Sequence, residues 1–472
     1  MSHTYARAIP VGYPRAQPRA STMEATKTQF RWLCALVLSF CYELPLFQVT
    51  SFDRLNPRLF DIVTVFGFLI FLFQNHNFQR AFNNPVFKRW FWVVVWFGVC
   101  AVVWACLWLP WEEAGVYSLF FAGKYIQGLF CIYLVASIPL SGKQKHLLHW
   151  MVVFGGVVVA VYAIYEKFLL AGTPRKIANG KEIITAEGTL FSCLGPIYFH
   201  VATFSSVASA MTFALTNKYQ ASTKKMMLFA TALFIAWPAV FCGSRTGLVM
   251  VLIILAAVFL YMERTRITLF LSLILAVGAV LSMFTSSEFV ERASDASLSV
   301  QRLITSESSR GRANGIAARL QLGIFAVTGH GNDYEWQGAR MPFLGGGFYT
   351  VPFSEGGRIT KFRIGYGIHN SYLFPYEQAG ILGILLSGIW FVATFKCLRR
   401  FRKSANPDDK EFATGAWCLF IALIPVACVG QIFWSWAGTE NVNTFLLVLL
   451  VLGCKPSTNQ SNMRTRPQAI HR

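Results

Sequence analysis

Two segments of this sequence carry side chains suited to binding phosphate or moving a proton. Arg245 lies in FCGSRTGL (241–248), a short turn between two apolar runs. Its guanidinium offers a planar donor fork that matches a phosphate, but it could equally anchor the chain at a membrane interface by snorkelling. His369 lies in GYGIHNSYLFPYEQAGILG (365–383). It could act as a general base, because only histidine titrates near neutral pH without heavy tuning, or it could cap a helix end.

A further group of arginines lies in SSRGRANGIAARLQLG (308–323). Arg312 and Arg319 are seven residues apart, so a helix would place both on one face. A solvated basic face is the simplest interpretation. Arg319 differs because the apolar stretch 320–327 follows it, which suggests a helix that packs on a membrane domain with Arg319 at its inner surface.

A glycine cluster follows in FLGGGFYTVPF (343–353). Three consecutive glycines permit a close backbone approach and a positive φ, so we expect a turn. A phosphate-binding nest is the alternative. The segment is not a P-loop, because no Lys-Ser/Thr helix follows it.

Several polar residues have supporting roles in these predictions. Asn370 could orient His369 or cap a helix, and Glu377 would lie on nearly the same helix face, where it needs a partner or a cavity. Lys124 and Glu43 interrupt apolar runs, so we expect them to pair with each other or with structural partners. His330, Asp333 and Glu335 match no zinc spacing, and no metal site is expected.

The composition limits which elements can position these residues. The 472 residues include 42 Lys or Arg and 22 Asp or Glu, a net charge of +20. Hydrophobic residues make up 55% and charged residues only 14%, against roughly 25% charged in soluble proteins. This excludes a disordered chain, a disulfide scaffold and an ordinary cytosolic enzyme. The eleven cysteines contain no CxxC pair and are expected to be small buried hydrophobes.

About twelve apolar runs are candidate membrane spans. Several of them are short or contain proline, so ten or eleven spans are the alternative. The twelve runs cover residues 33–50, 59–73, 90–109, 118–139, 148–170, 189–215, 226–243, 247–262, 267–285, 371–397, 412–434 and 442–454. Basic connections alternate with non-basic ones along the whole chain, which places both termini in the cytoplasm. Most of the net charge of +20 is therefore explained by cytoplasmic Lys and Arg residues that orient the helices. Nucleic acid is not an expected partner.

We therefore expect an all-α polytopic integral membrane protein with one large, partly helical periplasmic loop. The predicted division is a cytoplasmic tail (1–31), nine spans (32–285), the periplasmic loop (286–370), three spans (371–454) and a second cytoplasmic tail (455–472). The positive-inside rule does not apply to long loops, so the arginines of the periplasmic loop can have a functional role.

The order of these features resembles a known family. An SRTG turn between two spans is followed by an arginine-bearing outer loop, a glycine cluster, HNSYL at the start of a span, and E-x-x-G-I-L-G behind it. This arrangement, over residues 226–400, resembles the O-antigen ligase and O-antigen polymerase superfamily of bacterial envelope glycosyltransferases.

The resemblance implies an activity and a site. Family members transfer a glycan from undecaprenyl pyrophosphate to an acceptor hydroxyl at the periplasmic face of the inner membrane, without metal or cofactor. By this likeness Arg245 and Arg319, with Arg312 as substitute, would bind the pyrophosphate, and His369 would act on the acceptor hydroxyl. Supporting positions would be Ser244, Asn370 and Glu377.

The acceptor is less constrained than the donor. The resemblance favours a ligase that uses lipid A–core; a polymerase and a protein O-oligosaccharyltransferase are alternatives within the family. Direct in-line attack would invert the anomeric carbon. A non-enzymatic transporter of a lipid-linked glycan is a more distant alternative, although no internal repeat is evident. Membrane lipids are expected partners in every case.

Overall fold

A computed structural model gives the structure of this chain. It describes residues 25–44, 46, 57–73, 78–107, 115–169, 174–176, 182–184, 192–194, 198–216, 218–219, 222–242, 250–251, 254, 345, 350–355, 358–364, 371–427, 432–434 and 441–458. Helices dominate this part of the chain, and the strands form two hairpins. The expected all-α class is confirmed for the described residues.

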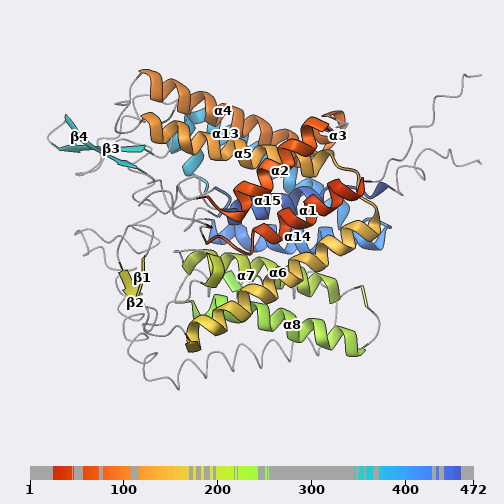
Figure 1. The fold of residues 1–472 in the computed structure, drawn as a ribbon. Helices are drawn as coiled ribbons and strands as arrows, with labels where there is room; N and C mark the ends of the chain where they lie inside the picture. The colour runs from red at the N-terminus through yellow and green to blue at the C-terminus, as the bar shows by residue number, and fades with distance from the viewer. Residues whose placement is uncertain are drawn as a thin grey trace, which may run out of the picture.

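The helices pack in three layers (Figure 1). The upper layer holds α2 (Leu59–Phe73), α3 (Phe78–Asn83), α4 (Pro85–Leu107), α5 (Val116–Ser137) and α13 (Phe374–Phe401). The middle layer holds α1 (Lys27–Ser39), α14 (Pro407–Val426) and α15 (Asn441–Gly453). The lower layer holds α6 (Gly142–Leu169), α7 (Tyr198–Thr216) and α8 (Ser222–Phe241), and the short 3-10 helix η4 (Ser192–Leu194) precedes α7.

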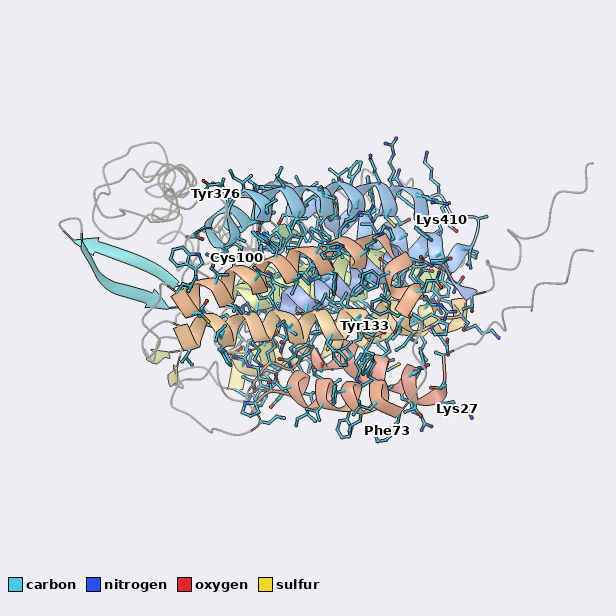
Figure 2. All side chains as sticks on the ribbon, turned by 90° about the horizontal axis from the view of Figure 1, so that it is seen from above. Lys27, Phe73, Cys100, Tyr133, Tyr376 and Lys410 are labelled. Carbon is cyan, nitrogen blue, oxygen red and sulfur yellow. The ribbon has the colours of Figure 1, made fainter. Side chains whose placement is uncertain are left out.

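Both hairpins lie at one end of this bundle, which we call the hairpin end (Figures 1 and 2). Strand β1 (Pro174–Lys176) pairs antiparallel with β2 (Glu182–Ile184). Strand β3 (Thr350–Glu355) pairs antiparallel with β4 (Arg358–Ile364), with a register shift between Phe353 and Ser354. Lys27 and Lys410 mark the opposite end, which we call the lysine end (Figure 2). The bundle thus has two chemically different ends.

Four described helices are long and apolar enough to cross a membrane: Pro85–Leu107, Ser118–Ser137, Gly142–Leu169 and Phe374–Phe401. By helix length and hydropathy the chain is a multi-pass membrane protein. Large apolar side chains on α2 and α13 are exposed, including Phe66, Phe73, Leu385 and Ile389. Such exposure disfavours a water-soluble fold, whereas a lipid environment accommodates it.

The centre of the bundle is built from aromatic side chains. Trp90 stacks on Trp434 with ring centroids 5.1 Å apart, and Trp390 packs against Trp90 at the same separation. On the other side of the middle layer, Phe445 of α15 stacks on Phe204 at 4.9 Å. After its polar first turn, helix α15 is apolar around its whole circumference and buried, as expected for a helix enclosed by others.

The expected spans agree closely with the observed helices. Every predicted run except 247–262 and 267–285 overlaps a described helix, and those two lie almost entirely outside the described residues. Helix α1 begins at Lys27, inside the predicted tail, because Thr26 and Gln29 form a reciprocal capping box there. Strands β3 and β4 show that the predicted outer loop includes a hairpin as well as any helix.

Candidate functional site

Most of the predicted site lies outside the described residues. This applies to His369, Asn370, Arg245, Ser244, Arg312 and Arg319. The predicted cluster of His330, Asp333 and Glu335 also lies outside them. Glu377 is the predicted site residue that the structure describes. It is buried in the first turn of α13, and Gln378 Nε2 donates to its carboxylate at 3.0 Å. The expectation that this buried charge needs a partner is therefore confirmed.

Helix α13 breaks directly after Glu377. Ala379 has φ −144° and ψ 15°, and Gly380 has φ 65° and ψ −159°, so neither residue is helical. The carbonyl that the break frees at Ala379 accepts a hydrogen bond from Trp96 Nε1 at 2.8 Å. A membrane helix tolerates a break where neighbouring side chains satisfy the backbone. Glu377 thus lies at an interruption of a membrane helix rather than on a continuous helical face.

Gly345 of the glycine cluster packs against this break. Its φ is 71°, in the left-handed region, and it lies in a turn, as the sequence predicts. A Cβ added to Gly345 would lie 2.5 Å from the Ala379 nitrogen and 2.7 Å from the Glu377 carbonyl oxygen. Only glycine permits this approach. The glycine cluster and the first turn of α13 therefore meet here, although about thirty residues of chain separate them.

The HNSYL segment is anchored where it enters α13. Ser371 donates its backbone N–H to the Ala427 carbonyl at 2.8 Å, and its Oγ accepts from the Ile432 N–H at 2.8 Å. The Tyr372 hydroxyl donates to the Ile424 carbonyl at 2.7 Å. These bonds tie the start of α13 to the end of α14. His369 precedes this anchor by two positions in the chain.

A buried charge cluster surrounds Glu43, near the start of α15. Its Oε2 lies 3.4 Å from His200 Nδ1 and 3.6 Å from Arg58 Nη1, and its Oε1 accepts from the Asn441 N–H at 3.0 Å. Glu43 is fully buried. Lys124 instead pairs with Asp61, so of the two expectations for these residues the structure selects structural partners, not a mutual pair.

Lys124 lines a pocket inside the bundle and pairs with Asp61 beside it. Lys124 Nζ lies 2.7 Å from Asp61 Oδ1, and Gln127 Nε2 donates to the same oxygen at 2.8 Å. The pocket has a cavity volume of about 30 Å³, room for a few water molecules, and lies between α5 and α15. We call it the α5–α15 pocket. Its lining includes Trp90, Tyr125 and Phe433 together with Asn441, Asn443 and Thr444.

A second charged group lies at the lysine end. Lys145 Nζ donates to Asp409 Oδ1 at 2.8 Å and to the Lys455 carbonyl at 2.6 Å, and both charged side chains of the pair are buried. Lys455 Nζ donates to the Val135 and Ile138 carbonyls at the end of α5. Burial lowers the pKa of Lys455, and the neighbouring positive charges lower it further. We call these residues and their ion-pair partners the lysine-end network.

From the sequence, Lys145 is expected only to orient helices as a cytoplasmic charge. Its buried pairing was missed because the acidic partner lies 264 residues away in the chain. A usable signal was present: Asp408, Asp409 and Glu411 lie at the start of α14, next to a run of basic residues, where the positive-inside rule gives acidic residues no role.

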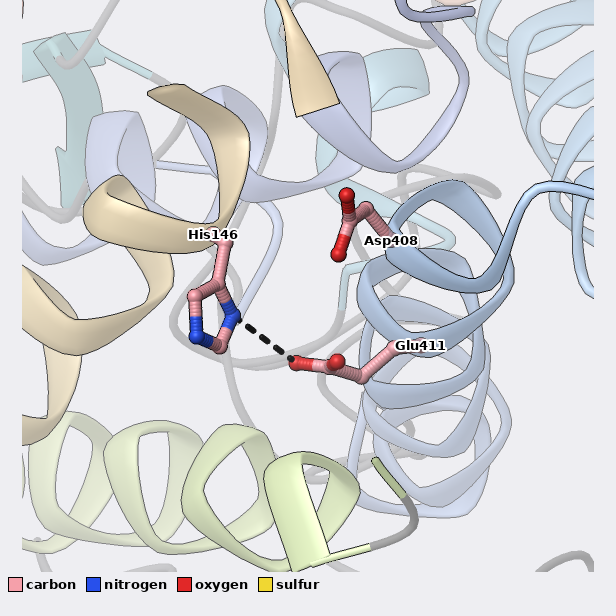
Figure 3. Close-up of side chains that lie close together, drawn as sticks. All are labelled: His146, Asp408 and Glu411. Carbon is pink, nitrogen blue, oxygen red and sulfur yellow. Dashed lines mark ion pairs between the residues drawn. The ribbon is translucent and has the colours of Figure 1, made fainter. Parts of the chain in front are cut away.

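His146, Asp408 and Glu411 bring one imidazole and two carboxylates within 4.8 Å of one another (Figure 3). Trp150 Nε1 donates to His146 Nε2 at 3.2 Å. The proton of a neutral imidazole must then be on Nδ1, the nitrogen that faces Glu411 at 4.0 Å. A protonated nitrogen cannot bind a metal ion, so this arrangement does not suit one.

The two carboxylates of this group also lie close to Lys218 and His149. Lys218 Nζ lies 2.6 Å from Asp408 Oδ1, and His149 Nδ1 lies 2.8 Å from Glu411 Oε1. The Met211 carbonyl lies 2.6 Å from His149 Nε2. Asp408, Glu411 and His146 therefore form a separate polar group beside the lysine-end network, and we interpret them as ion-pair partners rather than metal ligands.

The described cysteines are all free, and most of them are buried. This agrees with their expected role as small buried hydrophobes. No protein-family model matches this chain, and no curated protein sequence matches it.

Proposed function

We propose that this protein is a membrane glycosyltransferase of the O-antigen ligase type, which moves a glycan from undecaprenyl pyrophosphate to an acceptor hydroxyl. The observation that carries the proposal is the contact of Gly345 with the break in α13 after Glu377. It joins the glycine cluster to the HNSYL–E-x-x-G segment, two of the features on which the family resemblance depends.

The proposed orientation places the hairpin end in the periplasm. Both hairpins come from connections predicted to be on the outer side, and they lie at the same end of the bundle, opposite Lys27 and Lys410 (Figure 2). The proposal includes about twelve spans, with both termini in the cytoplasm of a bacterial cell and the large loop in the periplasm.

In the proposed reaction the acceptor O–H gives its proton to His369 as its oxygen attacks the anomeric carbon of the donor sugar. The bond from that carbon to the pyrophosphate oxygen breaks, and the lipid pyrophosphate leaves with the electron pair. Arg245 and Arg319, or Arg312 in its place, neutralise the charge that develops on the leaving group, which two guanidinium groups can do without a metal. Ser244, Asn370 and Glu377 support this arrangement.

The central test is His369→Ala in a transfer assay with purified protein, lipid-linked donor and lipid A–core. Loss of a general base should lower the transfer rate by about 10²–10⁴-fold. His471→Ala, a histidine change in the predicted C-terminal tail, is the matched control and should transfer normally. A fully active, folded His369→Ala variant refutes the role of His369. Inversion is checked by NMR of the product, and a retained anomeric configuration contradicts direct attack.

The assay also separates the alternatives. A transporter forms no product in detergent, whereas a transferase does. In a strain that lacks the protein, accumulated lipid-linked polymer indicates a ligase, and single lipid-linked repeat units indicate a polymerase. Transfer to a protein acceptor in place of lipid A–core identifies an O-oligosaccharyltransferase.

A further inference from the structure

Glu411 on α14 is a buried carboxyl group whose two oxygens lack an aligned hydrogen-bond donor. Its side chain is 4% exposed, and neither Oε1 nor Oε2 has a hydrogen-bond partner among the described residues. It does have a close neighbour on α6, because His149 Nδ1 lies 2.8 Å from its Oε1. A buried carboxylate without donors is unfavourable, so the protonation of this neighbour decides how Glu411 is stabilised.

The other ring nitrogen of His149 restricts where its hydrogen is. Nε2 lies 2.6 Å from the Met211 carbonyl oxygen on α7. A carbonyl oxygen can only accept a hydrogen bond, so Nε2 must carry a hydrogen. A neutral imidazole has a single N–H, which leaves a lone pair on Nδ1. That lone pair faces Glu411 Oε1 at 2.8 Å. Two acceptors at this distance repel each other unless a further proton is bound between them.

The neighbouring imidazole of His146 does not relieve this repulsion (Figure 3). Its Nε2 accepts from Trp150 Nε1 at 3.2 Å, so its own hydrogen is on Nδ1. This Nδ1 lies 4.0 Å from Glu411 Oε1, beyond the range of a hydrogen bond. The hydrogen bond that Glu411 needs must therefore come from the contact with His149.

The lysines of this region are paired with other carboxylates. Asp408 pairs with Lys218 at 2.6 Å. Asp409 pairs with Lys145 at 2.8 Å. The titratable side chains on the described elements around Glu411 are Lys145, His146 and His149 on α6, Asp408, Asp409 and Lys410 on α14, Lys218 and Tyr219 after α7, Lys224 on α8, and Lys455 after α15. Among the described residues the ion-pair contacts of Glu411 are with imidazoles, so no lysine supplies its counter-charge.

The distance between the two groups identifies the ligand. A separation of 2.8 Å between nitrogen and oxygen is that of a hydrogen bond, and it leaves no space for a water molecule or a metal ion between the two atoms. A proton fits there without any displacement of α6 or α14.

We propose that Glu411 and His149 form a proton-binding site, in which one proton shared by Oε1 and Nδ1 holds α14 to α6 at the lysine end. When this proton passes to water, the hydrogen bond is lost and two acceptors remain in contact, which favours separation of the two helices. The packing of the lysine end is thereby linked to pH. The inference goes beyond the proposed function and does not depend on it, since it involves no residue of the proposed reaction.

The first test measures unfolding of the full-length protein in mixed micelles from about pH 6 to about pH 9, across the range in which imidazole changes charge. Below about pH 6.5 the histidine of the unfolded chain is protonated too. Above it, the folded chain holds one proton more than the unfolded chain. Stability should therefore fall as the pH rises, with an unfolding constant that increases by up to about tenfold per pH unit.

Glu411→Gln isolates the contribution of the shared proton. The amide has the shape of the carboxyl group, and its NH₂ can donate to His149 Nδ1 without a titratable proton. This variant should lose the increase of the unfolding constant with pH. Asp408→Asn is the matched control, because it makes the same chemical change on the same helix at a carboxylate that pairs with Lys218. It should keep the pH dependence of the unaltered protein.

A second measurement needs no variant. In protein with ¹⁵N-labelled histidine and ¹³C-labelled methionine carbonyls, the His149 ring is recognised in solid-state NMR by the proximity of its Nε2 to the Met211 carbonyl. At neutral pH its Nδ1 should give the signal of a protonated or hydrogen-bonded nitrogen. The signal of an Nδ1 with a free lone pair overturns the proposal. The same pH dependence in Glu411→Gln as in the unaltered protein, or its loss in Asp408→Asn as well, also overturns it.

Discussion

The lysine-end network and the α5–α15 pocket both place charged side chains inside a membrane bundle, but they differ in how completely the polar groups are bonded. Asp409 accepts from Lys145, from the Ser457 N–H and from the Ser457 hydroxyl. In the pocket, the Asn441 amide and the Thr444 hydroxyl form no bonds among the described residues. The difference indicates that the network stabilises the fold, whereas the polar groups of the pocket contribute less to its stability.

The largest expected effect comes from breaking the buried pair of the network. Asp409→Ala leaves the Lys145 ammonium buried without its counter-charge, so we expect the free energy of unfolding to fall by about 3–5 kcal/mol. The measurement is an SDS titration in mixed micelles, followed by near-UV circular dichroism.

Asp408→Ala is the control for this variant, because Asp408 pairs with Lys218 through side chains that are 20% and 28% exposed. An exposed pair contributes about 0–1 kcal/mol, so the loss should be small. Equal losses for the two variants would show that burial of the pair is not what matters.

A smaller effect is expected at the break in α13. Gly345→Ala forces a Cβ onto a residue with φ 71°, where the left-handed conformation costs about 1–2 kcal/mol, and brings that Cβ to 2.5 Å from the Ala379 nitrogen. We expect transfer activity to fall more than thermal stability, because the change displaces the outer segment and leaves the helix packing in place. Activity and melting temperature are measured on the same preparation.

Gly388→Ala tests whether any added methyl on α13 has this effect. A Cβ at Gly388 meets no atom within 4 Å, and alanine is preferred in a helix by about 0.5–1 kcal/mol. The variant should be as active as the unaltered protein and equally or more stable. If Gly345→Ala behaves in the same way, the contact with the break has no role in activity.

A still smaller effect on stability is expected in the pocket. The Thr444 hydroxyl has no bond to lose, so Thr444→Val should change the free energy of unfolding by less than about 0.5 kcal/mol. The same SDS titration measures it. A loss comparable to that of Asp409→Ala would assign the pocket a structural role and remove the contrast between the two regions.

No effect is expected from metal ions at the lysine end. Neither excess EDTA nor added Zn²⁺ should shift the melting temperature, because the Trp150 indole occupies the lone pair of His146 Nε2 and leaves the proton on Nδ1. A stabilisation by Zn²⁺ that disappears in His146→Ala would contradict the interpretation of these residues as ion-pair partners.

The sequence predicted the helices well because a long apolar run is itself the physical cause of a membrane helix. It located α13, the turn at Gly345 and the need of Glu377 for a partner. It did not predict the break at Ala379 and Gly380, since that conformation is stabilised by Trp96 from a different part of the chain. The partners of Lys124 and Lys145 were missed for the same reason: a pair across helices follows from packing, which hydropathy does not encode.

The candidate site was predicted mainly by resemblance, and Glu377 is the member that the described residues include. The α5–α15 pocket had no signal in the sequence beyond a lysine within an apolar run. An asparagine at a helix start and a threonine in an apolar helix are ordinary there, and only their lack of bonds in the folded chain distinguishes Asn441 and Thr444.

The shortness of α15 bears on how the protein is made. Its 13 residues extend about 20 Å, whereas the hydrocarbon layer is about 30 Å thick. Such a segment has little capacity to insert alone, and the ribosome delivers it after all the other described helices. Its entry into the membrane therefore depends on helices already in place. Lys455 then donates hydrogen bonds to the carbonyls at the end of α5. Truncation just before Asn441 should leave an assembly intermediate with an open centre, a natural substrate for membrane quality control.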